Sequence, residues 1–231
     1  MNSTILITGA AGNLGRAVAS AFAERGANLV LVDVQREALE KAFGAADGRR
    51  LLAPTNLLDQ GEADATVKSA LERFGRIDVA CNIAGAFRMG PPVHETSEKD
   101  WNFLFDVNAR TVLHTSRAVV PAMIRNGGGK IVNVGAYAAL KGVAAMGAYV
   151  ASKSAVIRIT ETMAAELREK NINVNCVLPT IIDTPENRTA MPKADPRRWV
   201  APQDLAAVIV FLASDAARAV HGAAIPVTGL S

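Results

Sequence analysis

The chain has 231 residues, of which 50% are hydrophobic and 20% charged, and its formal net charge is +3 at pH 7. This length and hydrophobic content allow one domain with a large core, while the small charge imbalance and scattered basic residues argue against nucleic acid as a partner. No uncharged apolar stretch is long enough to span a membrane, and a first strand expected from residue 3 leaves no room for a signal peptide. We therefore expect a cytoplasmic protein without a membrane partner.

Apolar runs alternate with amphipathic segments along the whole chain. We expect strands at 3–8, 29–32, 50–54, 77–82, 130–134, 172–178 and 223–227, and helices at 13–25, 35–43, 60–74, 97–125 (in one piece or two), 149–169 and 202–213. Strand–helix alternation indicates crossover units, and continuous Val, Ile and Leu runs are typical of strands covered on both faces. The sequence therefore predicts an α/β fold in which residues 1–231 form a single domain. Its core is a Rossmann-like, doubly wound parallel sheet of about seven strands with helices on both faces.

Three segments interrupt this alternation, at 86–96, 135–147 and 180–200. Each follows the carboxyl end of an expected strand, where open α/β sheets bind their ligands. The segment 180–200 is the longest and contains three prolines, so we expect an irregular loop that acts as a substrate lid. The large side chains expected to line an apolar pocket beneath it are Phe87, Met89, Met146, Met191 and Trp199.

A glycine motif follows the first expected strand. Gly9, Gly12 and Gly15 have the spacing G-x-x-G-x-x-G, and a helical pattern resumes at Leu14. Glycines let the backbone turn tightly and approach a pyrophosphate, which binds the N–H groups at the start of the helix. Asp33 ends the next expected strand, where a carboxylate binds the 2′-hydroxyl of an adenosine ribose. Together these features predict a dinucleotide site.

Tyr149 and Lys153 lie four residues apart in an expected helix and therefore share one face. An ammonium beside a phenol favours the phenolate and lowers its pKa from about 10. Tyr149 would then be a usable acid or base near neutral pH. The pair alone is common on exposed helix faces, but together with the glycine motif it indicates an active site.

These motifs together resemble the short-chain dehydrogenase/reductase superfamily along essentially the whole chain. The resemblance implies Tyr149 as the acid/base, Lys153 as a ligand of the nicotinamide ribose that tunes Tyr149, and Asn108 as the holder of a relay water. It implies cofactor contacts at Gly9, Gly12, Asn13, Leu14, Gly15, Asp33, Asn56, Leu57, Asn82, Ala84, Gly85, Tyr149, Lys153, Pro179, Ile182 and Thr184. NAD(H) is the preferred cofactor on this reading because Asp33 would repel a 2′-phosphate, although Arg16 or Arg36 would make NADP(H) possible.

The superfamily's substrate-positioning serine is absent, and Ala136 occupies its place. Three explanations compete: the protein does not catalyse, another hydroxyl such as that of Tyr137 substitutes, or the substrate needs no serine donor. The stretch from Asp183 to Asp195 resembles quinonoid dihydropteridine reductases, which also lack the serine. That resemblance implies a conjugated quinonoid ring as substrate.

The leading hypothesis is an NAD(H)-dependent oxidoreductase acting on a small molecule, best guessed as a quinonoid dihydropteridine-like ring. The alternatives are a ketone or 3-oxoacyl reductase with a substitute donor, and a non-catalytic cofactor-binding sensor. We expect a homodimer or homotetramer, because the helices near 98–125 and 149–169 carry more apolar residues than one sheet-facing stripe needs. Cys81 and Cys176 are expected to be buried thiols, and the three histidines share no metal spacing, so no metal site is expected.

Overall fold

Seven strands form one parallel sheet in the computed structural model, which describes residues 3–231. They are β1 (Thr4–Thr8), β2 (Asn28–Asp33), β3 (Arg50–Pro54), β4 (Val79–Asn82), β5 (Gly129–Val134), β6 (Ile172–Pro179) and β7 (Ala224–Val227). Their order is β3-β2-β1-β4-β5-β6-β7, and every neighbouring pair is parallel. The strand order reverses between β1 and β4, so the predicted doubly wound Rossmann-like sheet is confirmed.

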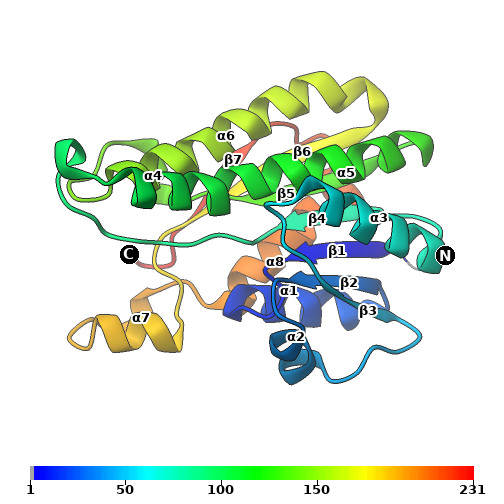
Figure 1. The fold of residues 1–231 in the computed structure, drawn as a ribbon, viewed down its shortest axis with the longest axis horizontal. Coiled ribbons are helices and arrows are strands. Elements are labelled where there is room, and N and C mark those ends of the chain that lie inside the picture. Colours follow the sequence, from blue (N-terminus) through cyan, green and yellow to red (C-terminus); the bar gives the residue numbers. More distant parts are fainter. Residues whose placement is uncertain (1–2) are drawn as a thin grey trace.

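Helices cover both faces of the sheet (Figure 1). One face carries α1 (Asn13–Ala23), α2 (Arg36–Phe43) and α8 (Pro202–Leu212), and the other carries α3 (Gln60–Phe74), α5 (Thr111–Arg125) and α6 (Gly147–Leu167). The shorter α4 (Glu98–Phe105) packs against α6. Among the residues described, no helix is both long and apolar enough to cross a membrane.

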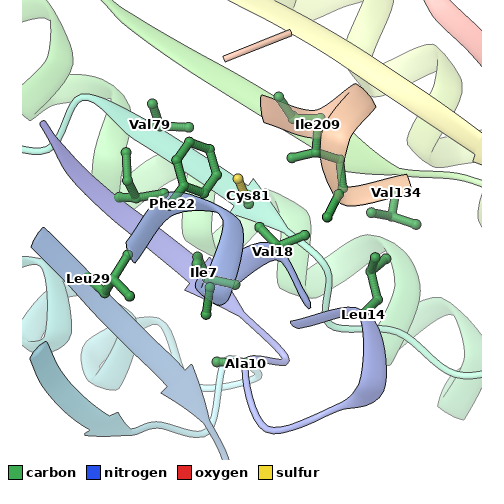
Figure 2. Close-up of a cluster of buried hydrophobic side chains, with 14 of the residues drawn as sticks. Ile7, Ala10, Leu14, Val18, Phe22, Leu29, Val79, Cys81, Val134 and Ile209 are labelled. Atoms are coloured by element: carbon green, nitrogen blue, oxygen red, sulfur yellow. The ribbon is translucent and has the colours of Figure 1, made fainter. Parts of the chain in front are cut away.

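Alternate residues of the central strands face opposite helical layers, because side chains alternate across a strand. In β1, Ile5 and Ile7 join the cluster beneath α1 and α8, whereas Leu6 joins the cluster on the other face. Figure 2 shows the first cluster, in which Val18 and Phe22 of α1 pack with Ile7. Burial on both faces explains the continuous apolar runs in the sequence.

Two elements differ from the expected boundaries near the site. The expected helix at 97–125 is continuous but contains a π-helical turn, Asp106–Arg110, between α4 and α5. The expected lid at 180–200 is partly helical, because it contains α7 (Pro185–Ala190) and a 3₁₀ turn, Pro196–Arg198. The Thr184 hydroxyl accepts a hydrogen bond of 3.2 Å from Asn187 N and caps α7, whose first residue is a proline. A capped start with proline at its first position is what makes this short helix form.

The carboxyl ends of the strands meet at one edge of the molecule. In Figure 1, α7 and the segment between β4 and α4 both extend to this edge, on the left of the view. The base of the 180–200 segment is closed by pairing of Ile182 with Val200, and Asp183 N donates to Val200 O at 2.8 Å. The edge therefore brings together the three segments that interrupt the strand–helix alternation.

Candidate active site

The glycine motif forms a tight connection between β1 and α1. Gly9 has φ +62°, and a Cβ there would lie 2.9 Å from Ala84 N, while a Cβ on Gly15 would collide with the carbonyl oxygen of Gly9. The N-cap residue of α1 is Gly12, no side chain caps this end of the helix, and its first turn has no acidic residue. The first N–H groups of α1 are therefore left for an anion.

Asp33 connects the end of β2 to this loop. Its Oδ2 accepts a 3.0 Å hydrogen bond from Ala11 N, and its Oδ1 accepts a 2.8 Å bond from Val34 N. Each carboxylate oxygen keeps a second lone pair that can accept from a ribose hydroxyl. The nearest candidate cations are engaged elsewhere: Arg36 lies 3.6 Å from Glu40, and Arg16 donates to Asn13 Oδ1 at 2.8 Å.

Asn56 and Leu57 follow the end of β3, the strand beside β2. Asn56 N donates to Glu62 Oε2 at 2.7 Å, and Asn56 Oδ1 accepts from Leu58 N at 3.1 Å. Leu57 is buried, and its carbonyl oxygen lies 2.9 Å from His114 Nδ1. Both residues are thus fixed at the same edge of the sheet as Asp33.

The stretch after β4 is held by β1. Thr8 Oγ1 accepts from Ile83 N at 3.0 Å and from Ala84 N at 3.1 Å. Asn82 Nδ2 donates to Asn133 Oδ1 at 2.8 Å, while the buried Asn82 Oδ1 has no hydrogen-bond partner within residues 3–231. The backbone after β4 is therefore fixed by β1, at the same edge of the sheet as the glycine motif.

Asn108 lies in the π-helical turn and clamps the backbone just beyond that stretch. Its Oδ1 accepts from Ala86 N at 2.9 Å, and its Nδ2 donates to Ala86 O at 3.1 Å and to Ser152 Oγ at 3.0 Å. The residue is fully buried. The π turn shifts the helix register at Asn108, and such turns are frequent at functional sites.

Lys153 is 5% exposed, and its Nζ donates to Val134 O at 2.8 Å. Gly85 makes room for it: a Cβ at that position would lie 3.0 Å from Lys153 Nζ and 2.9 Å from Asn108 Oδ1. Burial lowers the pKa of Lys153 to about 8. The ammonium therefore persists at neutral pH in a site with little water around it.

Tyr149 lies in the first turn of α6, one turn before Lys153. Burial raises its pKa to about 12. The prediction that Lys153 lowers this pKa is wrong for the present arrangement, because desolvation of the phenolate dominates and the ammonium donates to Val134 O instead. At neutral pH, Tyr149 is consequently a neutral phenol that can donate a proton.

Ala136, in the place of the absent serine, is 4% exposed. It belongs to an apolar cluster with Val156, Ile157 and Leu178, against which Tyr149 packs. The hydroxyl-bearing Tyr137 begins a 3₁₀ turn and is 41% exposed. The surroundings of Ala136 are thus apolar, and the neighbouring tyrosine extends to the surface.

A pocket of about 100 Å³ adjoins Tyr149, and its walls come from the segments at 88–104 and 145–149. Its apolar lining includes the predicted Met89 and Met146, and the ring of Phe87 meets Tyr149 edge-on with centroids 4.9 Å apart. Met191 and Trp199 do not line it, and Trp199 is buried with 7% exposure. The apolar pocket therefore forms between two of the three loops rather than under the longest one.

A side-chain hydrogen bond joins the segment at 180–200 to the glycine motif. Glu186 Oε2 accepts a 2.8 Å hydrogen bond from Asn13 Nδ2. Three more residues of β6 and this segment are predicted to contact the cofactor. Pro179 is the last residue of β6, and Thr184 caps α7. The carbonyl oxygen of Ile182 accepts a 2.8 Å hydrogen bond from Asn187 Nδ2. Leu14, also predicted to bind cofactor, has its side chain in the core, so only its backbone can take part.

Comparison with known proteins identifies the family. A family model described as Enoyl-(Acyl carrier protein) reductase matches residues 9–229. The chain is 35% identical to the 3-oxoacyl-(acyl-carrier-protein) reductase FabG of Thermotoga maritima, over 97% of this chain and 95% of that protein. A solved short-chain type dehydrogenase/reductase from Mycobacterium ulcerans superposes with a TM-score of 0.92 at 27% identity, over 100% of this chain and 90% of that one. This chain belongs to the short-chain dehydrogenase/reductase family.

The structure of an NAD⁺-bound xylitol dehydrogenase is also similar, with a TM-score of 0.90 and 30% identity over 98% of both chains. This short-chain dehydrogenase/reductase is an NAD(P)-dependent oxidoreductase. Its residues fit a nicotinamide dinucleotide. The start of α1, which no side chain caps, and the glycine turn before it can receive the phosphates, and the Asp33 carboxylate can accept a hydrogen bond from a ribose hydroxyl.

Sequence reasoning missed several residues that position this site. Thr8 ends the first expected strand, and its role as a double acceptor depends on where β4 ends. Ser152, which accepts from Asn108, gives no signal of its own in the sequence. Glu186 and the Arg88–Asp100 ion pair, with Nη1 and Oδ1 2.8 Å apart, join segments too distant in sequence for a pattern to reveal.

Proposed function

We propose that this enzyme interconverts a secondary alcohol and a ketone on a small substrate, with Tyr149 as proton donor or acceptor and NAD(H) as the preferred cofactor. The observation that carries the proposal is the position of Tyr149, which lines the pocket at the carboxyl edge of the sheet and lies one helical turn from the buried Lys153. The bound nicotinamide would accept or supply the hydride.

The side chains have distinct parts in this proposal. Tyr149, kept neutral by burial, would donate its proton to the oxygen of a ketone as negative charge develops there. Lys153, buried one helical turn beyond Tyr149, would bind the nicotinamide ribose, the role that the family resemblance implies. Asn108 fixes the backbone at Ala86. It would also hold a relay water, the role that the resemblance to the superfamily implies. Phe87 orients the Tyr149 ring by its edge-on contact.

The test uses the two tyrosines of the chain as a matched pair. Tyr149→Phe removes the titrating hydroxyl and little volume, so kcat/KM should fall by roughly 10²–10⁴ while the Kd for NADH stays within about twofold. Tyr137→Phe is the control, and its turnover should match the wild type because that ring is largely at the surface. Wild-type turnover in Tyr149→Phe would refute the role of Tyr149, and loss in Tyr137→Phe alone would make Tyr137 the substitute donor.

The preference for NAD(H) is supported by Asp33 and by the engagement of Arg16 and Arg36 with other side chains. A 2′-phosphate would meet the Asp33 carboxylate, whereas a ribose diol can donate to it. Wild type should therefore bind NADH at least tenfold more tightly than NADPH, and Asp33→Asn should narrow that ratio. Fluorescence titration of both cofactors measures it, and tighter binding of NADPH to the wild type would contradict the assignment.

A second candidate substrate is a quinonoid dihydropteridine-like ring. The specific observation in its favour is Ala136, because a conjugated ring that spreads its charge needs no serine donor. The 3-oxoacyl-(acyl-carrier-protein) reductase and the xylitol dehydrogenase that this chain resembles are named for other substrates. Wild type and Ala136→Ser should be compared with NADH on a quinonoid dihydropterin, a simple ketone and a 3-oxoacyl thioester.

Three results of this comparison separate the hypotheses. Turnover of the pterin that changes less than about tenfold in Ala136→Ser supports the conjugated ring. Turnover of the ketone that rises in Ala136→Ser, where one added donor is worth about 2–3 kcal/mol, supports ordinary carbonyl chemistry. NADH binding without turnover of any substrate, in either protein, favours the cofactor-binding sensor.

We also propose that the enzyme is a homodimer or homotetramer. The outer face of α4 and α5 exposes Trp101, Leu113 and Ile124. Trp101 stacks on Phe105, with ring centroids 4.7 Å apart, which extends the apolar surface. Apolar side chains grouped on neighbouring helices are typical of an isologous interface.

A further inference from the structure

The pocket beside Tyr149 has a polar part that the proposed chemistry does not use. Besides Tyr149, the lining side chains that carry polar groups are Arg88, Thr96 and Asp100. Arg88 Nη1 donates to Asp100 Oδ1 at 2.8 Å. Both side chains are a little under half exposed, so they are accessible from the pocket and from solvent.

This ion pair is held in place on both sides. The Arg88 guanidinium lies over the Phe103 ring, 3.8 Å from its centroid. Asp100 Oδ2 accepts from Ser97 Oγ at 2.8 Å, and Asp100 N donates to Ser97 Oγ at 3.1 Å, a reciprocal cap at the start of α4. Binding a substrate therefore requires little ordering of these groups, which lowers its entropic cost.

The pair retains free hydrogen-bonding capacity. Arg88 Nε and Nη2 have no hydrogen-bond partner in the described part of the chain, and each Asp100 oxygen accepts only one bond there. A neutral hydroxyl can accept from the guanidinium and donate to the carboxylate at the same time. A carboxylate or phosphate would be attracted by Arg88 but repelled by Asp100. Because the pair has no net charge, it gives such an anion little net attraction.

We propose that Arg88 and Asp100 form a recognition pair for a neutral hydroxyl group next to the reacting carbon, so that the preferred substrate is an uncharged diol or hydroxyketone. This inference rests on the proposed alcohol–ketone chemistry of Tyr149. Thr96, whose hydroxyl makes only a long 3.4 Å bond to Pro92 O, offers a third polar contact in the same pocket. A substrate without the second hydroxyl would not make these hydrogen bonds, so the site would discriminate against it.

Three substrates that share a ring and a secondary alcohol test this directly: cyclohexanol, trans-1,2-cyclohexanediol and 2-hydroxycyclohexanecarboxylate. With NAD⁺, the wild type should oxidise the diol with a kcat/KM at least about tenfold above either of the others. In Asp100→Asn, Arg88 keeps an uncompensated charge, so the hydroxy acid should gain at least about tenfold relative to the diol. Asp47→Asn is the matched control, because it removes the acid of an Arg–Asp pair outside the pocket and should leave all ratios unchanged.

Equal kcat/KM values for the diol and cyclohexanol in the wild type would overturn the inference, as would unchanged ratios in Asp100→Asn. The failure of the proposed chemistry has a different signature, since then none of the three compounds would be oxidised. In that case, the recognition pair can still be tested by calorimetry, which measures the Kd of each compound for the Tyr149→Phe protein with NAD⁺. Tighter binding of the diol supports the recognition pair, and equal binding of all three compounds rejects it.

Discussion

Replacing Lys153 with methionine should make the protein more stable at neutral pH while it removes activity. Lys153 is 5% exposed, and burial lowers its pKa from 10.5 to about 8. One unit of pKa corresponds to about 1.4 kcal/mol, so holding this ammonium in the folded protein costs roughly 3 kcal/mol below pH 8. Methionine fills a similar volume without the charge but leaves the buried Val134 O without this donor, which costs about 2 kcal/mol. The net gain in the free energy of unfolding should be about 1 kcal/mol at pH 7.

The pH dependence gives this prediction its own signature. Between pH 8 and 10.5 the unfolded chain binds more protons at Lys153 than the folded protein does, so the stability of the wild type should rise with pH in that window. The methionine variant lacks this contribution, and its advantage should disappear within that window. The raised pKa of Tyr149 acts in both proteins and cancels in the difference.

Urea unfolding of both proteins at pH 7 and pH 10 measures this difference. Lys68→Met is the control, because Lys68 is 78% exposed and its replacement should give no pH-dependent change. A Lys153→Met protein that is less stable than the wild type at pH 7, or whose difference from it does not vary with pH, would refute the reasoning.

The other predictions concern the loops around the site. Gly85→Ala should lower kcat/KM at least about tenfold because its Cβ would press on the two buried polar groups behind it, whereas Gly142→Ala, with no atom within 4 Å of its Cβ, should match the wild type in steady-state assays. Glu186→Gln should bind NADH a few-fold more tightly in fluorescence titrations, since it removes a negative charge beside Asn13, where the cofactor's phosphates are expected. An unchanged affinity would show that Glu186 does not lie near the bound phosphates. Light scattering at micromolar concentration should give a dimer or tetramer mass for the wild type and a smaller one for Trp101→Glu; a wild-type monomer would end the interface proposal.

The sequence was enough to predict the fold because each level of pattern agreed with the others. Alternation of apolar runs and amphipathic segments is a property of neighbouring residues, and so are the glycine spacing and the acid at Asp33. The structure confirms the seven-stranded parallel sheet that these patterns indicate. The overlooked α7 had a local signal as well, Thr184 followed by Pro185, but the prolines of the segment favoured an irregular loop.

The electrostatics of the site could not be predicted in the same way. A Tyr–Lys spacing of four residues establishes a shared helix face, but the pKa of Tyr149 depends on how deeply α6 is buried and on which acceptor Lys153 finds. That acceptor, Val134 O, belongs to β5 and is set by the packing of a helix on a sheet. Long-range contacts of this kind leave no periodicity in the sequence.

The stretch Asn82–Ala86 connects the glycine motif, where we propose that the cofactor binds, to the pocket beside Tyr149. Thr8 holds its backbone from the glycine side through two N–H groups, and Asn108 holds Ala86 from the helical side through two more hydrogen bonds. Between these clamps lies Gly85, against which Lys153 packs. Phe87, which follows this stretch, contacts the Tyr149 ring, so the backbone held by these two clamps also leads to the side chain that we propose as the proton donor. Hydride and proton transfer to one substrate require a fixed distance between cofactor and tyrosine, and under the proposed function this doubly clamped stretch would maintain it.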